Sequence, residues 1–401
     1  METNVEHRSE RMACDGNIAV AYGVMLCRPD VMSFLPITPQ HGMLTELYKF
    51  QCSGLVDAEV IEAEGEQSAM SVVNAASACG SRTFISSSAA GLNFAWDAFK
   101  ATCALRLPVV MVNVSREECP PSVVVHSQQD IVSAKDQGWI QIYPETCQEC
   151  LDMTIMAYRL AEDKDVLLPV IVCMDGFFLS HLTEIVDVPA RDRVDKFLAP
   201  LQQMDRTKLT AEQVVLCGAG FIEQDLAQAR YEYCEAMERV KAKYEEIDKE
   251  FGNAFGRNGG GLLQEYRTED AEVVLVTLGT VSGTARVAID KKREEGIKVG
   301  LVRITMLRPL PRERLAQALK GKKAVGVIDR NICFGCNCGG VFMDIKSVLY
   351  DLDTQPRAVN FIDGIGGIDI SVERVEKAIN VVHQASLGQP VPEVTWLALK
   401  K

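Results

Sequence analysis

Apolar runs of strand length alternate with helical patterns along this chain, and this alternation most restricts the fold it can adopt. Residues 108–114 (PVVMVNV) and 167–174 (LLPVIVCM) are almost continuously hydrophobic, which is typical of strands buried on both faces of a parallel sheet. Before the second run, Leu151, Ile155 and Tyr158 step by four and three, the spacing of one helical face. The pattern predicts an α/β protein.

The same alternation begins again at residue 272. We predict strands at 272–278, 298–304 and 323–329, with helices at 284–294 and from Pro311 to about 320. A β-α-β-α-β order forms an open parallel sheet with right-handed crossovers. At roughly 150 residues per domain, the 401 residues also favour two or three domains.

A long amphipathic helix is predicted between the two sets, over residues 222–251. Its apolar residues recur every three or four positions, and its other face is charged. The stretch GNAFGRNGGG follows, which indicates a flexible hinge. We therefore predict a first domain at 1–220, a linker helix and hinge at 221–268, and a second domain at 269–401.

Charge and hydropathy exclude several classes of function. The chain has 42 Lys and Arg against 55 Asp and Glu, a net charge of −13, so it repels phosphate backbones and nucleic acid is not expected as a partner. Its first sixteen residues are polar and do not resemble a signal peptide. No apolar run reaches the length of about 18 residues that spans a membrane. We expect a cytoplasmic protein without a membrane partner.

The 14 cysteines are the unusual part of the composition. Most lie inside apolar runs and are expected to be reduced core residues. Two clusters stand apart, Cys147 with Cys150, and Cys333 with Cys336 and Cys338 in a Gly-rich turn. Neither matches a zinc site or a four-cysteine iron–sulfur pattern. A reduced, thiol-rich turn is the favoured interpretation of the second cluster, and whether it binds anything stays open.

Polar residues follow the predicted strands of the first domain, and ligands of open α/β sheets bind at that edge. Thr38 lies between two prolines, which stiffen the backbone around its hydroxyl. Glu62, Glu64 and Glu66 alternate just before a helical stretch. Because close carboxylates repel one another, one of the three is expected to be protonated or paired if buried.

Two further groups complete this patch. The segment 86–91 (SSSAAG) is predicted to cap the next helix, and Arg116 almost directly follows the strand at 108–114. Taken singly, these residues would be a cap, a surface acid and a surface arginine. Together, a hydroxyl, a carboxylate and a guanidinium suit a small anionic substrate.

Other motifs are not specific. The five histidines lack a paired metal-binding spacing, and neither a P-loop nor a nucleophile elbow occurs. The Gly-rich stretch 364–367 only loosely resembles a dinucleotide-binding turn, so a plain connection from strand to helix is the better interpretation.

Several motifs resemble the α subunit of the 2-oxoacid:ferredoxin oxidoreductases, the pyruvate:ferredoxin oxidoreductase family. They extend over nearly the whole chain, in the family's order: PITP at 36–39, EGEQSA at 64–69, SSAAGL at 87–92, KDQGWIQIY at 135–143, LPVIVCMDGFFLSH at 168–181 and DRNICFG at 329–335. The resemblance implies a thiamine-diphosphate pyrimidine-type domain followed by a transketolase-C-like open parallel α/β domain.

The resemblance also implies roles for individual residues. Glu66 matches the glutamate that hydrogen-bonds the cofactor's aminopyrimidine ring and so promotes formation of the nucleophilic ylide. Thr38 matches the threonine that contacts the substrate, and Arg116 matches the arginine that pairs with the substrate carboxylate. Ser88 and Gly91 are expected to line the cofactor site. In the family, a 2-oxo acid loses carbon dioxide, electrons pass to iron–sulfur clusters, and coenzyme A usually takes the acyl group.

Two motifs are absent from the sequence. There is no G-D-G motif for a magnesium-diphosphate site and no C-x₂-C-x₂-C-x₃-C ferredoxin run. We therefore expect partner subunits to supply the diphosphate half of the cofactor site with its Mg²⁺, and the 4Fe–4S clusters that pass electrons to ferredoxin or another acceptor. The competing hypothesis is a non-catalytic scaffold that only docks the cluster-bearing chains.

Departures from the family pattern concern the substrate. Leu35 replaces the motif's tyrosine, Ala89 and Ala90 replace polar residues, and EECPPSVVVHSQQD at 117–130 differs from the pyruvate-type pattern. Smaller or more apolar groups predict a roomier, drier pocket. We therefore weigh a bulkier 2-oxo acid such as phenylglyoxylate against pyruvate, and the sequence leaves both open. Oxalate is disfavoured, because the oxalate enzymes have arginine where Thr38 stands.

Overall fold

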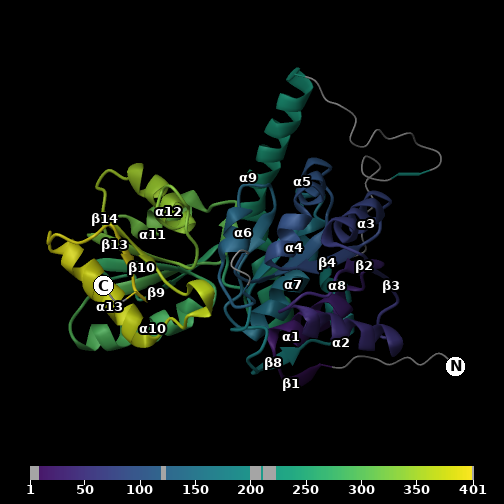
Figure 1. Ribbon diagram of the computed structural model, residues 1–401, viewed down its shortest axis with the longest axis horizontal. Coiled ribbons are helices and arrows are strands. Elements are labelled where there is room, and N and C mark those ends of the chain that lie inside the picture. The colour runs from purple at the N-terminus through teal and green to yellow at the C-terminus, as the bar shows by residue number, and fades with distance from the viewer. Residues whose placement is uncertain (1–8, 119–122, 199–208, 211–222, 400–401) are drawn as a thin grey trace.

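Two sheets organise the chain, each with helices packed on it (Figure 1). The computed structural model describes residues 9–118, 123–198, 209–210 and 223–399. The first sheet has seven strands in the order β12-β6-β7-β5-β4-β2-β3, all parallel except that β12 runs antiparallel to β6. In chain order its strands are β2 (Val31–Phe34), β3 (Glu59–Glu62), β4 (Thr83–Ser87), β5 (Val110–Ser115), β6 (Ile140–Ile142), β7 (Val170–Asp175) and β12 (Met306–Arg308).

In the described part of the first 222 residues, eight helices accompany this sheet. They are α1 (Gly16–Cys27), α2 (His41–Cys52), α3 (Glu66–Ala78), α4 (Ala89–Phe94), α5 (Trp96–Ala104), α6 (Gln129–Ser133), α7 (Cys147–Ala161) and α8 (Arg191–Leu198). A separate antiparallel pair joins β1 (Glu10–Cys14) to β8 (Glu184–Val188).

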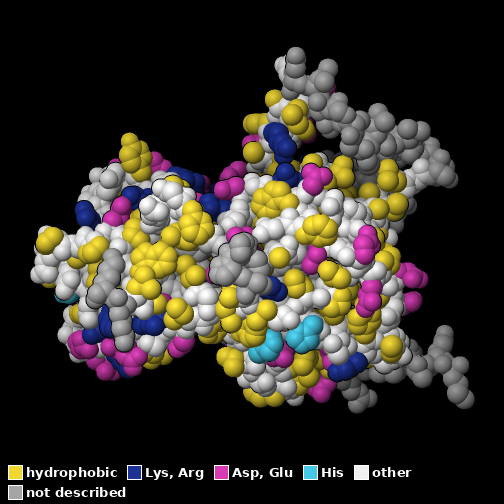
Figure 2. Space-filling view, in the orientation of Figure 1, with side chains coloured by type: hydrophobic (Ala, Val, Ile, Leu, Met, Phe, Trp, Pro, Cys, Tyr) yellow, Lys and Arg dark blue, Asp and Glu magenta, His cyan; other side chains and the backbone are white. Residues whose placement is uncertain are grey.

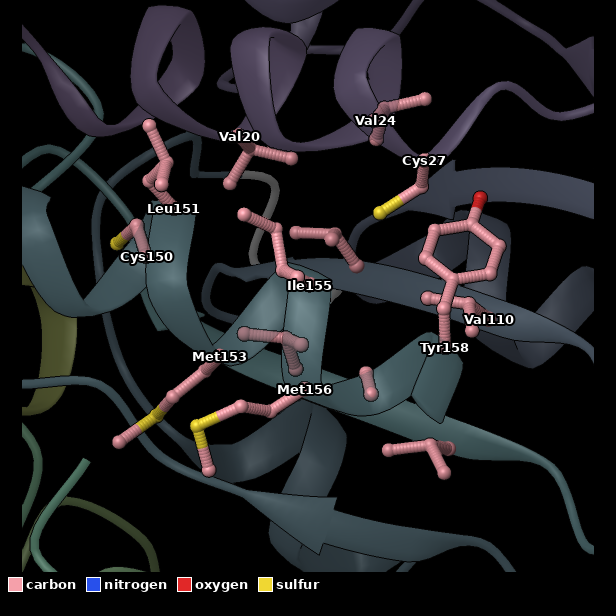
Figure 3. Packing of buried hydrophobic residues seen from close by; sticks show 14 of the residues in the cluster. Val20, Val24, Cys27, Val110, Cys150, Leu151, Met153, Ile155, Met156 and Tyr158 are labelled. Atoms are coloured by element: carbon pink, nitrogen blue, oxygen red, sulfur yellow. The ribbon is translucent and has the colours of Figure 1, made fainter. Parts of the chain in front are cut away.

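The core of the first domain explains its continuous apolar runs. Every residue of β5 and β7 is buried, as expected of strands covered on both faces. Helix α7 is also buried around nearly its whole circumference, because it lies between the sheet and α1. Figure 3 shows this packing, with α1 contributing Val20, Val24 and Cys27, and α7 contributing Leu151, Ile155 and Tyr158.

The second sheet has the order β15-β14-β13-β10-β11-β9 and is parallel except for β9. Its strands are β9 (Leu263–Tyr266), β10 (Val273–Leu278), β11 (Val299–Ile304), β13 (Ala324–Asp329), β14 (Arg357–Ile362) and β15 (Val394–Trp396). The associated helices are α10 (Val281–Glu294), α11 (Arg312–Leu319), α12 (Gly340–Tyr350), the short η2 (Ile365–Gly367) and α13 (Val372–Ser386). The strands and helices predicted from residue 272 onward are confirmed to within a few residues.

Helix α9 (Glu223–Phe255) runs between the two domains, and its first turns extend beyond the body of the protein (Figure 1). The helix was predicted, but its end at 251 and the hinge from 252 were wrong. Phe251 and Phe255 both pack against Phe197 of α8, with ring centroids 5.4 and 5.7 Å away. This aromatic contact extends the helix through Gly252, and the turn-rich segment begins at Gly256.

Two strands cross the predicted division at 1–220, 221–268 and 269–401, which stays a proposal. Strand β9 lies in the predicted linker but pairs with β11 of the second sheet. Strand β12 lies in the predicted second domain but pairs with β6 of the first. Of the helices in the described part of the chain, none combines the length and the apolar character needed to cross a bilayer.

Candidate active site

The strand order of the first sheet predicts where a ligand binds. Strand β2 lies between β3 and β4. The chain therefore adds β3 on one flank of β2 and then β4 on the opposite flank, so the strand order reverses at β2. Ligands of open α/β sheets bind in the crevice at such a reversal, outside the carboxyl ends of the strands. Each of four neighbouring strands has a candidate residue at or just after its carboxyl end: Thr38 after β2, Glu66 after β3, Ser87 at the end of β4 and Arg116 after β5. The structure therefore places the predicted residues at one edge.

Glu66 is the first residue of α3, and the residue is only 6% exposed. Within the described residues, its carboxylate has neither a hydrogen bond nor an ion pair. A buried carboxylate without a donor is costly unless a group from outside supplies one.

Gly91 and Ser87 lie against this carboxylate. A Cβ placed on Gly91 would be 2.4 Å from Oε1 of Glu66 and 2.5 Å from the Ser87 hydroxyl. The Ser87 Oγ is itself buried without a hydrogen-bond partner. Glu66, Ser87 and Gly91 therefore form a small cradle with unused polar atoms.

The other two glutamates of the alternating set point elsewhere. Glu62 is exposed and accepts a hydrogen bond of 2.6 Å from the Tyr48 hydroxyl. Glu64 is exposed, and a hydrogen bond from the Ser68 hydroxyl lowers its pKa. Only Glu66 is buried, so the mutual repulsion considered from the sequence does not arise.

Ser88 is the N-cap residue of α4, within the segment predicted to cap this helix, but its side chain makes no capping hydrogen bond. Its hydroxyl donates instead to the carbonyl of Val114 at 2.7 Å, because the residue is buried at the sheet edge. The neighbouring Ser87 is thus the serine with a free hydroxyl.

Arg116 and Thr38 are brought together as expected. The Arg116 Nη1 donates to the Thr38 carbonyl at 3.0 Å, and its Nε donates to the Val123 carbonyl at 3.1 Å. The side chain is largely buried, with 8% of the residue exposed. Both contacts use backbone acceptors and leave the guanidinium charge without a carboxylate partner in the described residues. The group can therefore pair with an anion.

Asp130 supports this edge, and sequence reasoning missed it. Its Oδ2 accepts hydrogen bonds from the backbone N–H of Ala89 at 3.0 Å and of Arg116 at 3.2 Å, and from the Asn113 amide at 3.0 Å. Burial raises the pKa of Asp130 to about 6, although these donors oppose the shift. The carboxyl fixes the starts of two candidate site segments.

A buried polar cluster joins the two domains beside the site, and it too was missed. Asp175, at the end of β7, accepts from Gln128 at 2.8 Å, from the Thr280 hydroxyl at 2.6 Å and from Arg330 at 2.9 Å. Arg330 also contacts His126 Nε2 at 2.9 Å. Burial lowers the pKa of His126 to about 4, so the ring is neutral at neutral pH.

The cysteine clusters supply no metal site among the residues that the structure describes. Cys147 and Cys150 are buried in α7, and burial raises the pKa of both thiols. Cys333 and Cys338 face each other across a short antiparallel bridge in an exposed turn. The reduced thiol-rich turn remains the best interpretation.

Comparisons with known proteins identify the family of this chain. The family described as "Pyruvate flavodoxin/ferredoxin oxidoreductase, thiamine diP-bdg" matches residues 22–249, and "Pyruvate:ferredoxin oxidoreductase core domain II" matches residues 271–375. The NADH-dependent phenylglyoxylate dehydrogenase subunit alpha of Aromatoleum evansii is 36% identical, over 96% of this chain and 94% of its own. Pyruvate synthase subunit PorA of Methanothermobacter thermautotrophicus is 39% identical, over 96% and 97%.

Solved structures support the fold. A 2-oxoglutarate:ferredoxin oxidoreductase from Magnetococcus marinus superimposes with a TM-score of 0.72 at 19% identity, over 94% of this chain and 65% of its own. A split-gene transketolase reaches a TM-score of 0.53 at 14% identity, over 92% and 97%.

The chain has an α/β fold similar to that of transketolase, and its first part matches a thiamine-diphosphate-binding family. The extent of the sequence match makes the assignment more specific. The chain belongs to the pyruvate:ferredoxin oxidoreductase family, as the α subunit of a 2-oxoacid oxidoreductase.

Proposed function

We propose that this chain is the catalytic α subunit of a thiamine-diphosphate-dependent enzyme that oxidatively decarboxylates a 2-oxo acid to an acyl-coenzyme A and carbon dioxide. Electrons then pass to iron–sulfur clusters on partner subunits, and from there to ferredoxin or another acceptor. The observation that carries the proposal is the buried, unpartnered carboxylate of Glu66 at the start of α3. A scaffold that only docked other chains would have no use for it.

The residues around Glu66 fit the aminopyrimidine ring of thiamine diphosphate. The carboxylate would accept a hydrogen bond from a ring nitrogen, and the free Ser87 hydroxyl offers a second polar contact. Gly91 leaves the space that a flat ring needs beside them. When bound, the cofactor supplies a thiazolium carbon that becomes a nucleophile on losing its proton, and a carboxylate at the pyrimidine promotes that loss.

Arg116 and Thr38 would bind the substrate. The guanidinium has the charge and the fork geometry that suit a 2-oxo acid carboxylate. Because the Arg116 side chain donates to the Thr38 carbonyl, the two residues lie side by side. A substrate paired with Arg116 would therefore lie next to the threonine. Both residues would thus orient the 2-oxo group at the cofactor.

The proposal includes partner chains. One would carry the diphosphate and Mg²⁺ half of the cofactor site, and another the 4Fe–4S clusters. Phe94 lies at the edge of the cradle, in contact distance of Gly65, and is 59% exposed. On the face shown in Figure 2, hydrophobic side chains spread over the first domain. An apolar side chain exposed beside a half-site suits burial under a second subunit.

Gly91→Ala should weaken binding of thiamine diphosphate about tenfold or more in the assembled enzyme. The added methyl meets Glu66 and Ser87 at distances too short for contact, so the carboxylate must move, and overpacking of this kind costs about 1–3 kcal/mol. Titration of the cofactor-free complex with thiamine diphosphate measures the effect. Ala90→Ser, on the exposed side of the same helix, is the matched control. Equal affinities in both variants would contradict the proposed cradle.

The substrate is proposed to be a bulkier 2-oxo acid such as phenylglyoxylate, with pyruvate as the alternative. Leu35, at the end of β2, is half-buried, and its carbonyl accepts from the Gln40 amide at 2.9 Å. An apolar side chain in place of the motif's tyrosine leaves a drier wall at the site. Part of the divergent segment after Arg116, residues 119–122, lies outside the described residues.

We expect kcat/KM for phenylglyoxylate to exceed that for pyruvate by about 10- to 100-fold in the assembled enzyme, since pocket size discriminates by about 1–3 kcal/mol. Leu35→Tyr should reverse part of this preference by restoring a bulky, polar group. Steady-state kinetics with both substrates check the prediction. A preference for pyruvate in the unaltered enzyme would refute the roomier pocket and leave the rest of the proposal intact.

A further inference from the structure

The second domain grips the segment Val123–Gln128 of the first domain by three contacts. The backbone N–H of Gly367 donates to the carbonyl of His126 at 2.7 Å, and the backbone N–H of Gln128 donates to the carbonyl of Arg330 at 3.0 Å. The Arg330 side chain reaches His126 Nε2 at 2.9 Å. These contacts join residues that are far apart in the sequence, and they fix the position of the segment relative to the second domain.

This segment is what holds Arg116. At one end, the Val123 carbonyl accepts from Arg116 Nε at 3.1 Å. In the middle, the Val125 carbonyl accepts from the backbone N–H of Glu117 at 2.9 Å. Arginine only donates, so Arg330 fixes Nε2 of His126 as an acceptor, and the ring's Nδ1–H donates to the carbonyl of Ser115, 3.3 Å away. The residues on both sides of Arg116 are therefore tied to the same segment.

Arg330 belongs to the second domain and is held at the junction with the first. It follows β13, is almost fully buried, and its Nη1 lies 2.9 Å from Asp175 and 3.0 Å from the Thr280 hydroxyl. Its guanidinium also lies over the ring of Phe178, 5.0 Å from the centroid. Nη1 thus meets Asp175 of the first domain and Thr280 of the second at the same point where it contacts His126, so the position of Arg330 on the second domain bears directly on His126.

The turn Gly364–Gly367, to which the sequence assigned no function, makes the other contact with the segment Val123–Gln128. Gly367 has a φ of 75°, and a Cβ added there would lie 2.7 Å from the Cβ of Val125. The backbone at Gly367 is therefore too close to Val125 to leave room for a larger residue. Its neighbour Gly366 has a similar φ of 69° but open space around its Cα.

We propose that Arg330 and Gly367 are positioning residues for Arg116, so that the second domain sets the enzyme's affinity for the substrate carboxylate. The inference rests on the proposed substrate role of Arg116. It gives the second domain a part in substrate binding without contact with the substrate, and it explains why a plain connection between strand and helix is built from adjacent left-handed glycines.

Gly367→Ala and Gly366→Ala test the proposal as a matched pair in the assembled enzyme. Both place alanine in the same left-handed backbone region, so their conformational cost is shared, and only Gly367→Ala pushes on Val125. We expect Gly367→Ala to raise KM for the preferred 2-oxo acid about tenfold, with kcat and the Kd of thiamine diphosphate within about twofold of the unaltered enzyme. Gly366→Ala should change none of the three. Equal KM values in the two variants would overturn the proposal.

A second pair of measurements separates this inference from the proposed function. Arg330→Lys, which keeps the charge but removes the Nη1 donor that reaches His126, should raise KM in the same way and provides the test if Gly367→Ala does not fold. In an Arg116→Ala background, the effect of either variant on KM should disappear, because the group being positioned is gone. If Arg116→Ala alone leaves KM unchanged, the substrate role of Arg116 fails. If Arg116→Ala raises KM while neither Gly367→Ala nor Arg330→Lys does, only the positioning fails.

Discussion

Glu66→Gln should lower kcat by about 10³-fold while the enzyme still assembles and binds thiamine diphosphate. The amide has nearly the same size, so the cradle formed with Ser87 and Gly91 keeps its shape. It lacks the negative charge, however, and is a weaker acceptor for a ring nitrogen, so the proton transfers that the carboxylate promotes slow down. Losses of about 10²–10⁴-fold are usual when one group for acid–base catalysis is removed.

The rate of hydrogen–deuterium exchange at the cofactor's thiazolium carbon measures this effect directly, and single-turnover kinetics measure its consequence. Glu64→Gln is the matched control, since Glu64 lies two residues away, is exposed and accepts a hydrogen bond from the Ser68 hydroxyl. It should leave both rates unchanged. If Glu66→Gln retained full activity, Glu66 would have no catalytic role and the scaffold hypothesis would gain.

Periodicity predicted the fold because it reflects burial directly. The runs at 108–114 and 167–174 are apolar throughout, since β5 and β7 are covered on both faces. Because parallel strands end at one edge of a sheet, the sequence also predicted Thr38, Glu66 and Arg116 at that edge, although it did not predict the order of the strands. A sheet of parallel strands leaves the carboxyl ends of β2, β3 and β5 no other arrangement.

Side-chain direction could not be predicted in the same way. Ser87 and Ser88 are adjacent and identical in sequence terms, yet the Ser88 hydroxyl donates to Val114 while Ser87 stays without a partner. Successive residues at a strand end point to opposite faces, and a shift of one position exchanges their roles. The predicted end of α9 was wrong for a related reason. Phe255 contacts Phe197, which lies far away in the sequence, and the local sequence pattern does not show such a contact.

The domain junction was missed because its members are far apart in the chain. His126, Asp175, Thr280 and Arg330 each look like an isolated polar residue in the sequence, and only the packing of the two domains makes them one buried cluster. Asp130 is a comparable case, since its hydrogen bonds to Ala89 and Arg116 span up to 41 residues of sequence. Buried polar groups of this kind require partners, so such residues in otherwise apolar stretches are the signal to seek.

The isolated chain should show no turnover of any 2-oxo acid, even with thiamine diphosphate, Mg²⁺ and coenzyme A in excess. Its candidate site offers contacts for the aminopyrimidine ring alone. The sequence has no G-D-G motif to carry Mg²⁺, and the diphosphate holds most of the cofactor's charge. With a net charge of −13, the chain by itself also repels that anion.

Adding the partner chains should restore turnover from nothing, and the affinity for thiamine diphosphate should rise with it. Calorimetric titration of the isolated chain with the cofactor, followed by the same titration after reconstitution, separates the two halves of the site. A Glu66→Gln chain reconstituted in parallel should regain binding but not turnover, which shows that assembly alone does not create activity. If the isolated chain turned over pyruvate or phenylglyoxylate, the diphosphate half of the site would have to lie within this chain. The division of the active site between subunits would then be wrong.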